Sequence, residues 1–304
     1  MEFILDRGST PLASTGHMNS NAKTYQCFYK ESSCGVGDFL RGSCFLFEAL
    51  ASVSRHFDID LTFHPIGKYF KNPSIVQYEK GHILDAERFA KEEPTKYLQL
   101  LLAETQRILN LKQDNIFLFT NYSDAILLSP EDYQKINVSK DCQEFMKSRL
   151  QFTKQITDYA DNIIQNKNYN LVHFRCGDFE LVKKEELEGI NNKNYHIDYK
   201  YCLDIVNNIE NPIVLSDSNE LKTYLQNNGI KILHSKSQHS SCNPGFIKDI
   251  EYEEDLMFYV ALDMNLISRS SFVYSYSVYP WGSGFVFWLA KIFNIPILTQ
   301  QIGV

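Results

Sequence analysis

An arginine follows directly on a short apolar run near the middle of the chain, in the segment Leu171-Val-His-Phe-Arg-Cys-Gly-Asp178. The apolar run predicts a buried strand, so Arg175 would stand where the chain leaves a sheet. Ligands bind at that end of the strands in open α/β sheets, and a guanidinium matches phosphate oxygens bidentately. These residues fit a phosphate-binding arginine, and an ordinary ion pair between Arg175 and Asp178 fits them equally well.

A glycine-containing turn, Gly35-Val-Gly37-Asp38-Phe-Leu-Arg41, precedes a helical pattern in the first half of the chain. Glycines between a strand and a helix let backbone N–H groups approach an anion at the helix N-terminus. The third glycine of a dinucleotide fingerprint would fall at Leu40, which disfavours a nicotinamide-dependent oxidoreductase. A tight turn with Asp38 as helix N-cap explains the same residues.

Small polar residues also follow two other predicted strands. Asp217 comes after the apolar run 212–215. Its carboxylate could accept hydrogen bonds from a sugar hydroxyl or from the N–H pair of guanine. Capping of the next helix explains the same residue. Ser270-Ser-Phe272 comes after a predicted strand over 265–267. Two serine hydroxyls with the neighbouring N–H groups would form a phosphate cradle there.

The elements that would position these residues alternate along the chain. In the first half we predict strands at 25–29, 59–63 and 115–120. We predict helices over 38–56, 97–109 and 139–165, and a further helical region that begins at Pro130. In the second half we predict strands at 170–175, 212–215, 230–233, 265–267 and 296–298, with helices at 198–208, 219–227, 253–262 and 280–293. Two successive βαβ arrays predict an α/β fold with two facing Rossmann-like domains, over residues 18–165 and 166–304.

Bulk properties narrow the class of protein. The net charge of −7 over 304 residues argues against binding a nucleic-acid backbone, and no run approaches the ~20 apolar residues that span a bilayer. Seven cysteines without a C-x-x-C pair indicate free thiols in a reducing compartment, so we expect a cytoplasmic protein. Residues 1–17 lack a signal-peptide pattern and have the composition of a leader left by cloning, with the native start at Met18.

Taken in order, the glycine turn, H-x-R-x-G-D (173–178), S-D (216–217) and S-S-F (270–272) resemble the fucosyltransferase superfamily. The superfamily includes α1,2-, α1,6- and nodulation-factor fucosyltransferases and, more distantly, protein O-fucosyltransferases. The resemblance spans about Cys27 to Ile297, with no match in 65–165, and G-x-G-D before a helix is most similar to the nodulation enzymes. It implies a GT-B fold and an inverting, metal-independent transfer of L-fucose from GDP-fucose to a glycan hydroxyl, with no cofactor.

The resemblance also implies roles for individual residues of the second half. Arg175 would hold the β-phosphate and stabilise the departing diphosphate. His173 would shape the nucleotide pocket, and Asp217 would bind the base or the ribose. Three further residues would hold the phosphates: Ser270, Ser271 and Phe272.

In the first half, Gly35, Gly37 and Asp38 would close the pocket from the N-terminal domain, with Arg41 nearby. Asp38 is also our candidate for the base that takes the acceptor proton, although N-cap duty explains it equally well. Many members have a second arginine where this chain has Cys176. That departure leaves two alternatives open. The donor could be another nucleotide sugar, such as a UDP-linked one, or the protein could be a module that binds a nucleotide or a glycan without catalysing transfer.

A metal-dependent mechanism is the remaining alternative. Asp58-Ile-Asp60 is a D-x-D, the metal signature of the other large glycosyltransferase fold. The two aspartates fall at the predicted start of a strand, where ordinary edge polarity explains them better. The eight histidines show no ligand spacing such as H-x-x-x-H, and we therefore predict no metal site.

Overall fold

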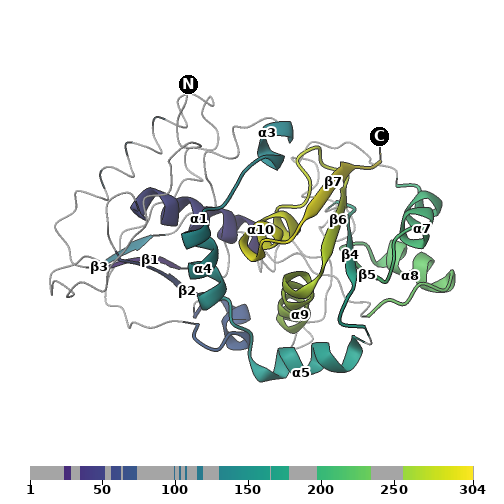
Figure 1. The fold of residues 1–304 in the computed structure, drawn as a ribbon, viewed down its shortest axis with the longest axis horizontal. Coiled ribbons are helices and arrows are strands. Elements are labelled where there is room, and N and C mark those ends of the chain that lie inside the picture. The colour runs from purple at the N-terminus through teal and green to yellow at the C-terminus, as the bar shows by residue number, and fades with distance from the viewer. Residues whose placement is uncertain are drawn as a thin grey trace, which may run out of the picture.

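Two parallel sheets organise the computed structural model of the chain (Figure 1). The structure describes residues 24–28, 35–51, 56–62, 64–73, 99, 103, 107, 115–118, 130–164, 166–177, 197–233 and 256–303. Predictions made for residues 1–17, for Asp178 and for most of the helix over 97–109 lie outside these ranges. No helix among the described residues is both long and apolar enough to cross a membrane.

The first sheet has the order β2-β1-β3, with β1 (Thr24–Phe28) between β2 (His56–Asp60) and β3 (Asn115–Leu118). Helix α1 (Val36–Ala51) connects β1 to β2, which is the βαβ unit predicted from the sequence. The predicted strand over 59–63 is wrong in position, since β2 ends at Asp60. The Asp60 carboxylate accepts from the N–H and the hydroxyl of Thr62, 2.8 and 2.7 Å away, and this local turn ends the strand.

The second sheet has the order β5-β4-β6-β7, and all its strands are parallel. Its strands are β4 (Asn170–Arg175), β5 (Pro212–Ser216), β6 (Phe272–Ser277) and β7 (Ile297–Gln301). Helices α7 (Tyr199–Asn207) and α8 (Asn219–Asn227) cover one face, and α9 (Leu256–Arg269) and α10 (Gly284–Phe293) cover the other (Figure 1). Successive residues of β4 point to opposite faces, so Leu171 packs toward α9 and α10 while Val172 packs toward α7 and α8.

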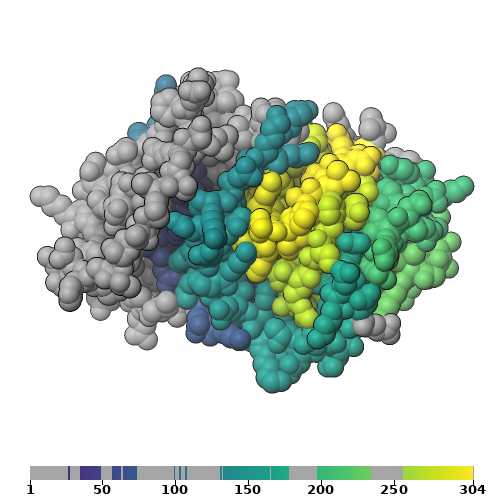
Figure 2. Space-filling view, in the orientation of Figure 1, coloured from purple at the N-terminus to yellow at the C-terminus, as the bar shows by residue number. Residues whose placement is uncertain are grey.

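Between the two sheets the chain forms η1 (Pro65–Tyr69), α3 (Pro130–Gln134), α4 (Lys140–Arg149) and α5 (Lys154–Ile163). The single helix predicted over 139–165 is therefore wrong, because α4 and α5 are separate. Phe152 lies between them and forms a β-bridge with Phe70, while the Thr153 N–H donates to the Tyr69 carbonyl at 2.8 Å. In Figure 2 the teal surface of α4 lies between the purple N-terminal residues and the yellow C-terminal residues.

Two other sequence predictions fail in the second sheet. The predicted strand over 265–267 is part of the continuous helix α9, and the strand that follows it is β6. The predicted strand over 230–233 is reduced to one bridge between Val214 and Ile232. The strands and helices predicted at 170–175, 198–208, 212–215 and 219–227 are confirmed to within one residue.

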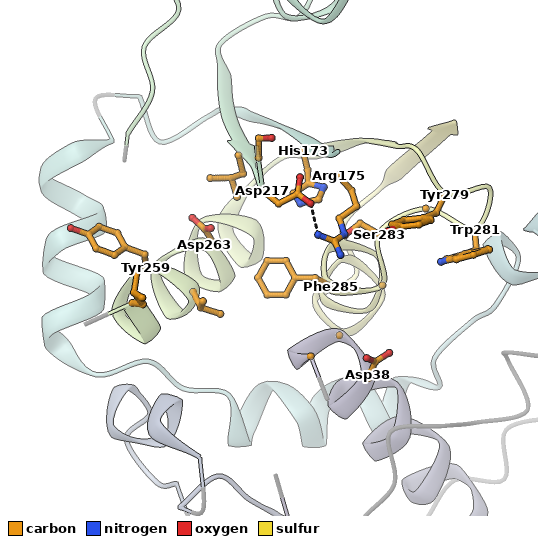
Figure 3. A pocket seen from close by; sticks show the side chains of 18 residues that line it. Asp38, His173, Arg175, Asp217, Tyr259, Asp263, Tyr279, Trp281, Ser283 and Phe285 are labelled. Atoms are coloured by element: carbon orange, nitrogen blue, oxygen red, sulfur yellow. Dashed lines mark hydrogen bonds and ion pairs between the residues drawn. The ribbon is translucent and has the colours of Figure 1, made fainter. Parts of the chain in front are cut away.

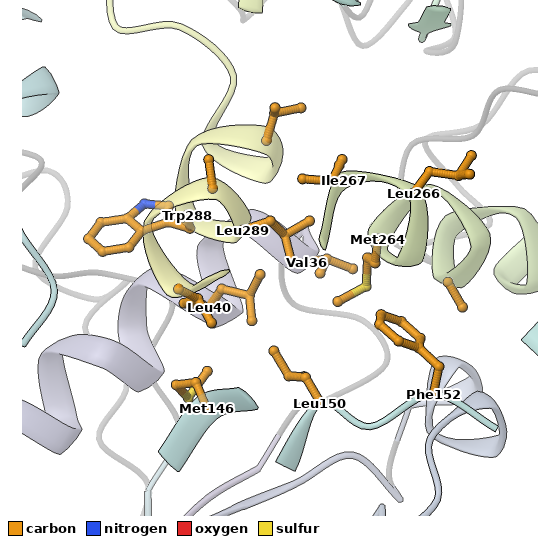
Figure 4. Close-up of a cluster of buried hydrophobic side chains, with 14 of the residues drawn as sticks. Val36, Leu40, Met146, Leu150, Phe152, Met264, Leu266, Ile267, Trp288 and Leu289 are labelled. Atoms are coloured by element: carbon orange, nitrogen blue, oxygen red, sulfur yellow. The ribbon is translucent and has the colours of Figure 1, made fainter. Parts of the chain in front are cut away.

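One apolar core joins the two sheets. In Figure 4, Val36 and Leu40 of α1 lie against Leu289 of α10 and near Met146 of α4. The first sheet lies before residue 165 and the second after it, and the precise domain boundary stays a prediction.

Helices α1 and α10 approach each other closely at Gly37. A Cβ atom placed on Gly37 would lie 2.4 Å from the Phe285 nitrogen and 2.6 Å from the Gly284 carbonyl carbon. Both neighbours are backbone atoms, which cannot move away as the end of a flexible side chain can. Only glycine at this position lets the N-terminal turns of the two helices touch.

We expect Gly37→Ala to lower the free energy of unfolding by about 1–3 kcal/mol, because the methyl group would push α1 away from α10. This clash outweighs the ~1 kcal/mol by which alanine favours a helix over glycine. Gly284→Ala is the matched control, since an added Cβ there meets nothing within 4 Å. Urea unfolding of both variants checks the prediction, and equal midpoints for Gly37→Ala and wild type would contradict it.

Candidate functional site

A cavity of about 240 Å³ lies between the carboxyl edge of the second sheet and the N-terminus of α1 (Figure 3). Strands β4 and β5 end at this cavity, and the segment after β6 forms another of its walls. The residues that line it are Gly35, Gly37, Asp38, His173, Arg175, Leu215, Ser216, Asp217, Leu256, Tyr259, Val260, Asp263, Tyr279, Trp281, Gly282, Ser283, Gly284 and Phe285. The cavity therefore occupies the place where open parallel sheets bind ligands.

Two helix N-termini meet at the cavity. The first turn of α1 begins after Gly35, whose carbonyl accepts from the Asp38 and Phe39 N–H groups at 3.0 and 3.1 Å. Helix α10 begins after Ser283, whose side chain makes no capping hydrogen bond. The N-terminus of a helix carries a partial positive charge and N–H groups that its own backbone does not use. The two helices together provide a cradle for an anion.

Arg175 is held in the cavity by Asp217. One guanidinium nitrogen of Arg175 donates to the Asp217 carboxylate, and the other carboxylate oxygen accepts from the Cys176 N–H at 2.6 Å. The two side chains are 19 and 10 % exposed, so solvent screens the pair only weakly. Asp217 lines the cavity and its carboxylate fixes Arg175, while its expected role in binding a base or a ribose stays a prediction.

His173 forms part of the cavity wall on the same face of β4 as Arg175. Its ring is buried, and its Nδ1 atom has no hydrogen-bond partner within the described part of the chain. Burial lowers the pKa of His173 to about 3, with a smaller contribution from the Arg175 charge, while Asp263 acts in the opposite direction. The neutral imidazole can therefore both donate and accept a hydrogen bond to a ligand.

The predicted N-terminal residues also reach the cavity. Gly35, Gly37 and Asp38 line it at the start of α1, and Figure 3 shows Asp38 on the side opposite Arg175. Asp38 forms an ion pair with Arg41 at 2.8 Å, and its side chain remains 43 % exposed. Arg41 itself does not line the cavity. Its position supports an indirect role, in which it acts on the site through its ion pair with Asp38.

The predicted phosphate cradle at Ser270, Ser271 and Phe272 is wrong. These residues precede β6, and Phe272 pairs with Asn170 at the amino edge of the sheet, whereas Arg175 pairs with Ser277 at the carboxyl edge. Five residues of strand separate the two edges by about 16 Å. The Ser270 hydroxyl donates to the Ile267 carbonyl at 2.9 Å and the Ser271 hydroxyl to the Asn168 side chain at 2.6 Å, so both serve the loop before the strand.

Several cavity residues were missed from the sequence. They are Tyr259 and Asp263 on α9 and Tyr279, Trp281, Ser283 and Phe285 before and in α10. A signal for the second group was present, because a serine and a glycine directly before an apolar helical run indicate a helix N-terminus. Asp263 carries no comparable signal, because it is one polar residue on a mostly buried helix.

The D-x-D segment lies away from the cavity. Asp58 forms an ion pair with Arg149, with 2.6 Å between Oδ1 and Nε, and Asp60 bonds Thr62. Burial raises the pKa of Asp58, while the Arg149 charge opposes the rise. Within the residues that the structure describes, no cluster of three or more histidine, cysteine or acidic side chains could hold a metal ion.

Solved structures show the fold to which this arrangement belongs. The fucosyltransferase NodZ from Bradyrhizobium superposes with a TM-score of 0.51 at 9 % identity, over 92 % of this chain and 96 % of that one. A NodZ alpha-1,6-fucosyltransferase co-crystallized with GDP matches with the same TM-score and identity, over 92 and 95 % of the two chains. No protein-family model matches the chain, and no curated protein sequence matches it. The expected α/β fold of the GT-B type is thereby confirmed.

We expect His173 to make stability depend on pH. Folding keeps His173 neutral down to pH about 3, whereas an exposed histidine takes up a proton near pH 6.5. The unfolded state therefore binds more protons between these values, and stability falls as the pH drops from 6.5 toward 3. At pH 5 the loss relative to neutral pH is about 2 kcal/mol.

Urea unfolding at pH 7.5 and pH 5 measures this loss. His173→Gln is the comparison, because glutamine keeps a polar side chain that does not titrate, and its stability should fall less between the two pH values. Equal losses in wild type and variant would exclude His173 as the source.

Proposed function

We propose that the protein is an inverting, metal-independent glycosyltransferase that moves L-fucose from GDP-fucose to a glycan hydroxyl. The observation that carries the proposal is Arg175, which Asp217 holds at the carboxyl edge of the sheet, opposite the N-termini of α1 and α10. The protein has its fold in common with fucosyltransferases of known structure, and this supports the same conclusion.

The proposed centre of the site binds the diphosphate. Sugar transfer passes through an oxocarbenium-like state while negative charge grows on the leaving phosphate. Arg175 and the first-turn N–H groups of α10 lie where they would meet that charge. Charge-assisted hydrogen bonds contribute about 1.5–3 kcal/mol each, so a bidentate arginine would supply roughly 3–5 kcal/mol, or on the order of 10²–10³ in rate.

The proposed subsite for the nucleobase is the part of the cavity that His173 and Asp263 line. A carboxylate there can accept from the N1–H and the amino group of guanine together, and the neutral imidazole can bond another atom of the base edge. Uracil offers only one N–H on that edge. The pair therefore favours a guanine nucleotide over a uracil nucleotide, and it takes the role first expected of Asp217.

We propose Asp38 as the base that accepts the proton of the acceptor hydroxyl. It lies across the cavity from Arg175, on the first turn of α1, and its side chain is partly open to solvent. A carboxylate on the side opposite the leaving group is what an inverting displacement needs. Arg41 would hold the carboxylate in place through their ion pair.

A thermal-shift panel tests the donor. GDP at saturating concentration should raise the melting temperature by several degrees in the presence of EDTA, and UDP should raise it much less. Selective stabilisation by UDP would overturn the guanine assignment, and no shift with either nucleotide would overturn the proposed function. A strict requirement for Mn²⁺ would contradict metal independence.

Arg175→Lys is the variant to examine in the same panel, because lysine keeps the charge and loses the bidentate geometry. It should lose most of the GDP shift and most of the release of fucose from GDP-fucose, while its melting temperature without ligand stays close to that of wild type. Nucleotide binding without transfer or donor hydrolysis in the wild type would instead indicate a binding module.

Asp38→Asn tests the proposed base. We expect GDP binding within about twofold of wild type and a fall in transfer of roughly 10²-fold or more, because an amide cannot accept the proton. The measurements are GDP affinity by calorimetry and the rate of fucose transfer. Transfer at the wild-type rate would eliminate Asp38 as the base.

A further inference from the structure

The rim of the cavity carries a pair of stacked aromatic side chains that the proposed donor chemistry does not use. The rings of Tyr279 and Trp281 are nearly parallel, with 11° between their planes and 5.3 Å between their centroids. Trp281 is 50 % exposed, although it borders the cavity (Figure 3). A stacked indole that is half exposed at the edge of a cavity offers a flat apolar surface to a ligand that enters the cavity.

The loop that carries the pair is rigid. Tyr279-Pro-Trp-Gly282 is a β-turn with proline in its second place, and the Gly282 N–H donates to the Tyr279 carbonyl at 3.1 Å. The Tyr279 N–H donates to the Ser277 hydroxyl at 3.1 Å. Gly282 has φ +87°, and a Cβ there would lie 2.6 Å from the Thr299 side chain of β7. The turn therefore fixes the backbone that carries both rings, and the stacking contact aligns the two rings with each other.

The pair also has a defined position relative to Arg175. The guanidinium carbon of Arg175 lies 5.7 Å from the centre of the Tyr279 ring. Figure 3 shows Tyr279 and Trp281 on one side of Arg175, and Asp263 on the other. A nucleotide sugar places its diphosphate between the base and the sugar. With the base at Asp263 and the diphosphate at Arg175, the aromatic end lies where sugar is transferred.

We propose that Tyr279 and Trp281 form the acceptor subsite, in which a pyranose ring of the acceptor glycan stacks on the exposed indole. This inference rests on the proposed function. The C–H bonds on one face of a pyranose carry a slight positive charge and fit the negative face of an aromatic ring. A half-open position at the rim suits the substrate that binds from solution, whereas a nucleobase also needs hydrogen-bonding partners, which lie at the other end of the cavity.

Transfer kinetics give the first test. Trp281→Ala should raise the KM for the acceptor at least tenfold and leave the KM for GDP-fucose within twofold, and Trp281→Phe should recover part of the loss. Tyr201→Ala is the matched control, because Tyr201 is an aromatic residue that is 45 % exposed on α7, away from the cavity. An unchanged acceptor KM in Trp281→Ala overturns the proposal.

Tryptophan fluorescence gives a binding test without turnover. The chain has two tryptophans, and Trp288 is buried with its indole N–H bonded to the Tyr133 hydroxyl at 2.8 Å. Chitotriose, N-acetyllactosamine and mannobiose are titrated with GDP present. Saturable quenching by at least one of them, abolished in Trp281→Phe, is the expected result. No quenching by any of the three overturns the proposal.

The remaining outcomes separate this inference from the proposed function. Quenching of Trp281 by GDP alone would place the nucleotide on the aromatic pair, and quenching by GDP-fucose beyond that of GDP would place the donor sugar there. Either result overturns the acceptor subsite while the donor assignment stands. Oligosaccharide quenching in a protein that GDP does not stabilise would support the aromatic pair as a sugar site and overturn the proposed function.

Discussion

The backbone contact between α1 and α10 at Gly37 is the constraint on which the site depends. With no side chain at Gly37, the first turns of the two helices lie against each other, and their partial positive ends are directed at the same cavity. Like partial charges brought together repel, so an anion bound between them stabilises both the site and the junction of the two sheets. The packing of the halves and the proposed binding of phosphate are therefore linked by one glycine.

The cavity has three chemically distinct parts along one line. Asp263 lies at one end, Arg175 lies in the middle with His173 beside it, and Tyr279 and Trp281 provide flat apolar surface at the other end (Figure 3). Asp217 fixes the central guanidinium, from which the two outer parts extend in opposite directions. Rigid supports of this kind lower the entropy lost when a long ligand binds, since the protein groups are already ordered.

Two failed sequence predictions, the strand over 265–267 and the phosphate cradle at 270–272, have a common origin in α9. Its residues near Leu266 and Ile267 are buried from several sides, because α5, α10 and η1 all pack against this helix. A helix covered on most sides loses the polar face that reveals its period, and a short apolar run then resembles a strand. Placing a strand there put Ser270, Ser271 and Phe272 at the wrong edge of the sheet and hid both β6 and the loop that carries Trp281.

The sequence by itself determined the α/β class, most of the elements around β4, and the position of Arg175 at the end of that strand, because these depend on local periodicity and on the residue that ends a strand. It also predicted that the glycine turn and Asp38 would close the pocket from the N-terminal half, and these residues line the same cavity as Arg175. Only the tertiary structure decided that Asp217 holds Arg175, that Asp263 lines the same cavity as His173, and that Tyr279 and Trp281 border it. Those neighbours come from strand order, helix packing and a loop closed by Gly282, which bring together residues up to about a hundred positions apart in the chain.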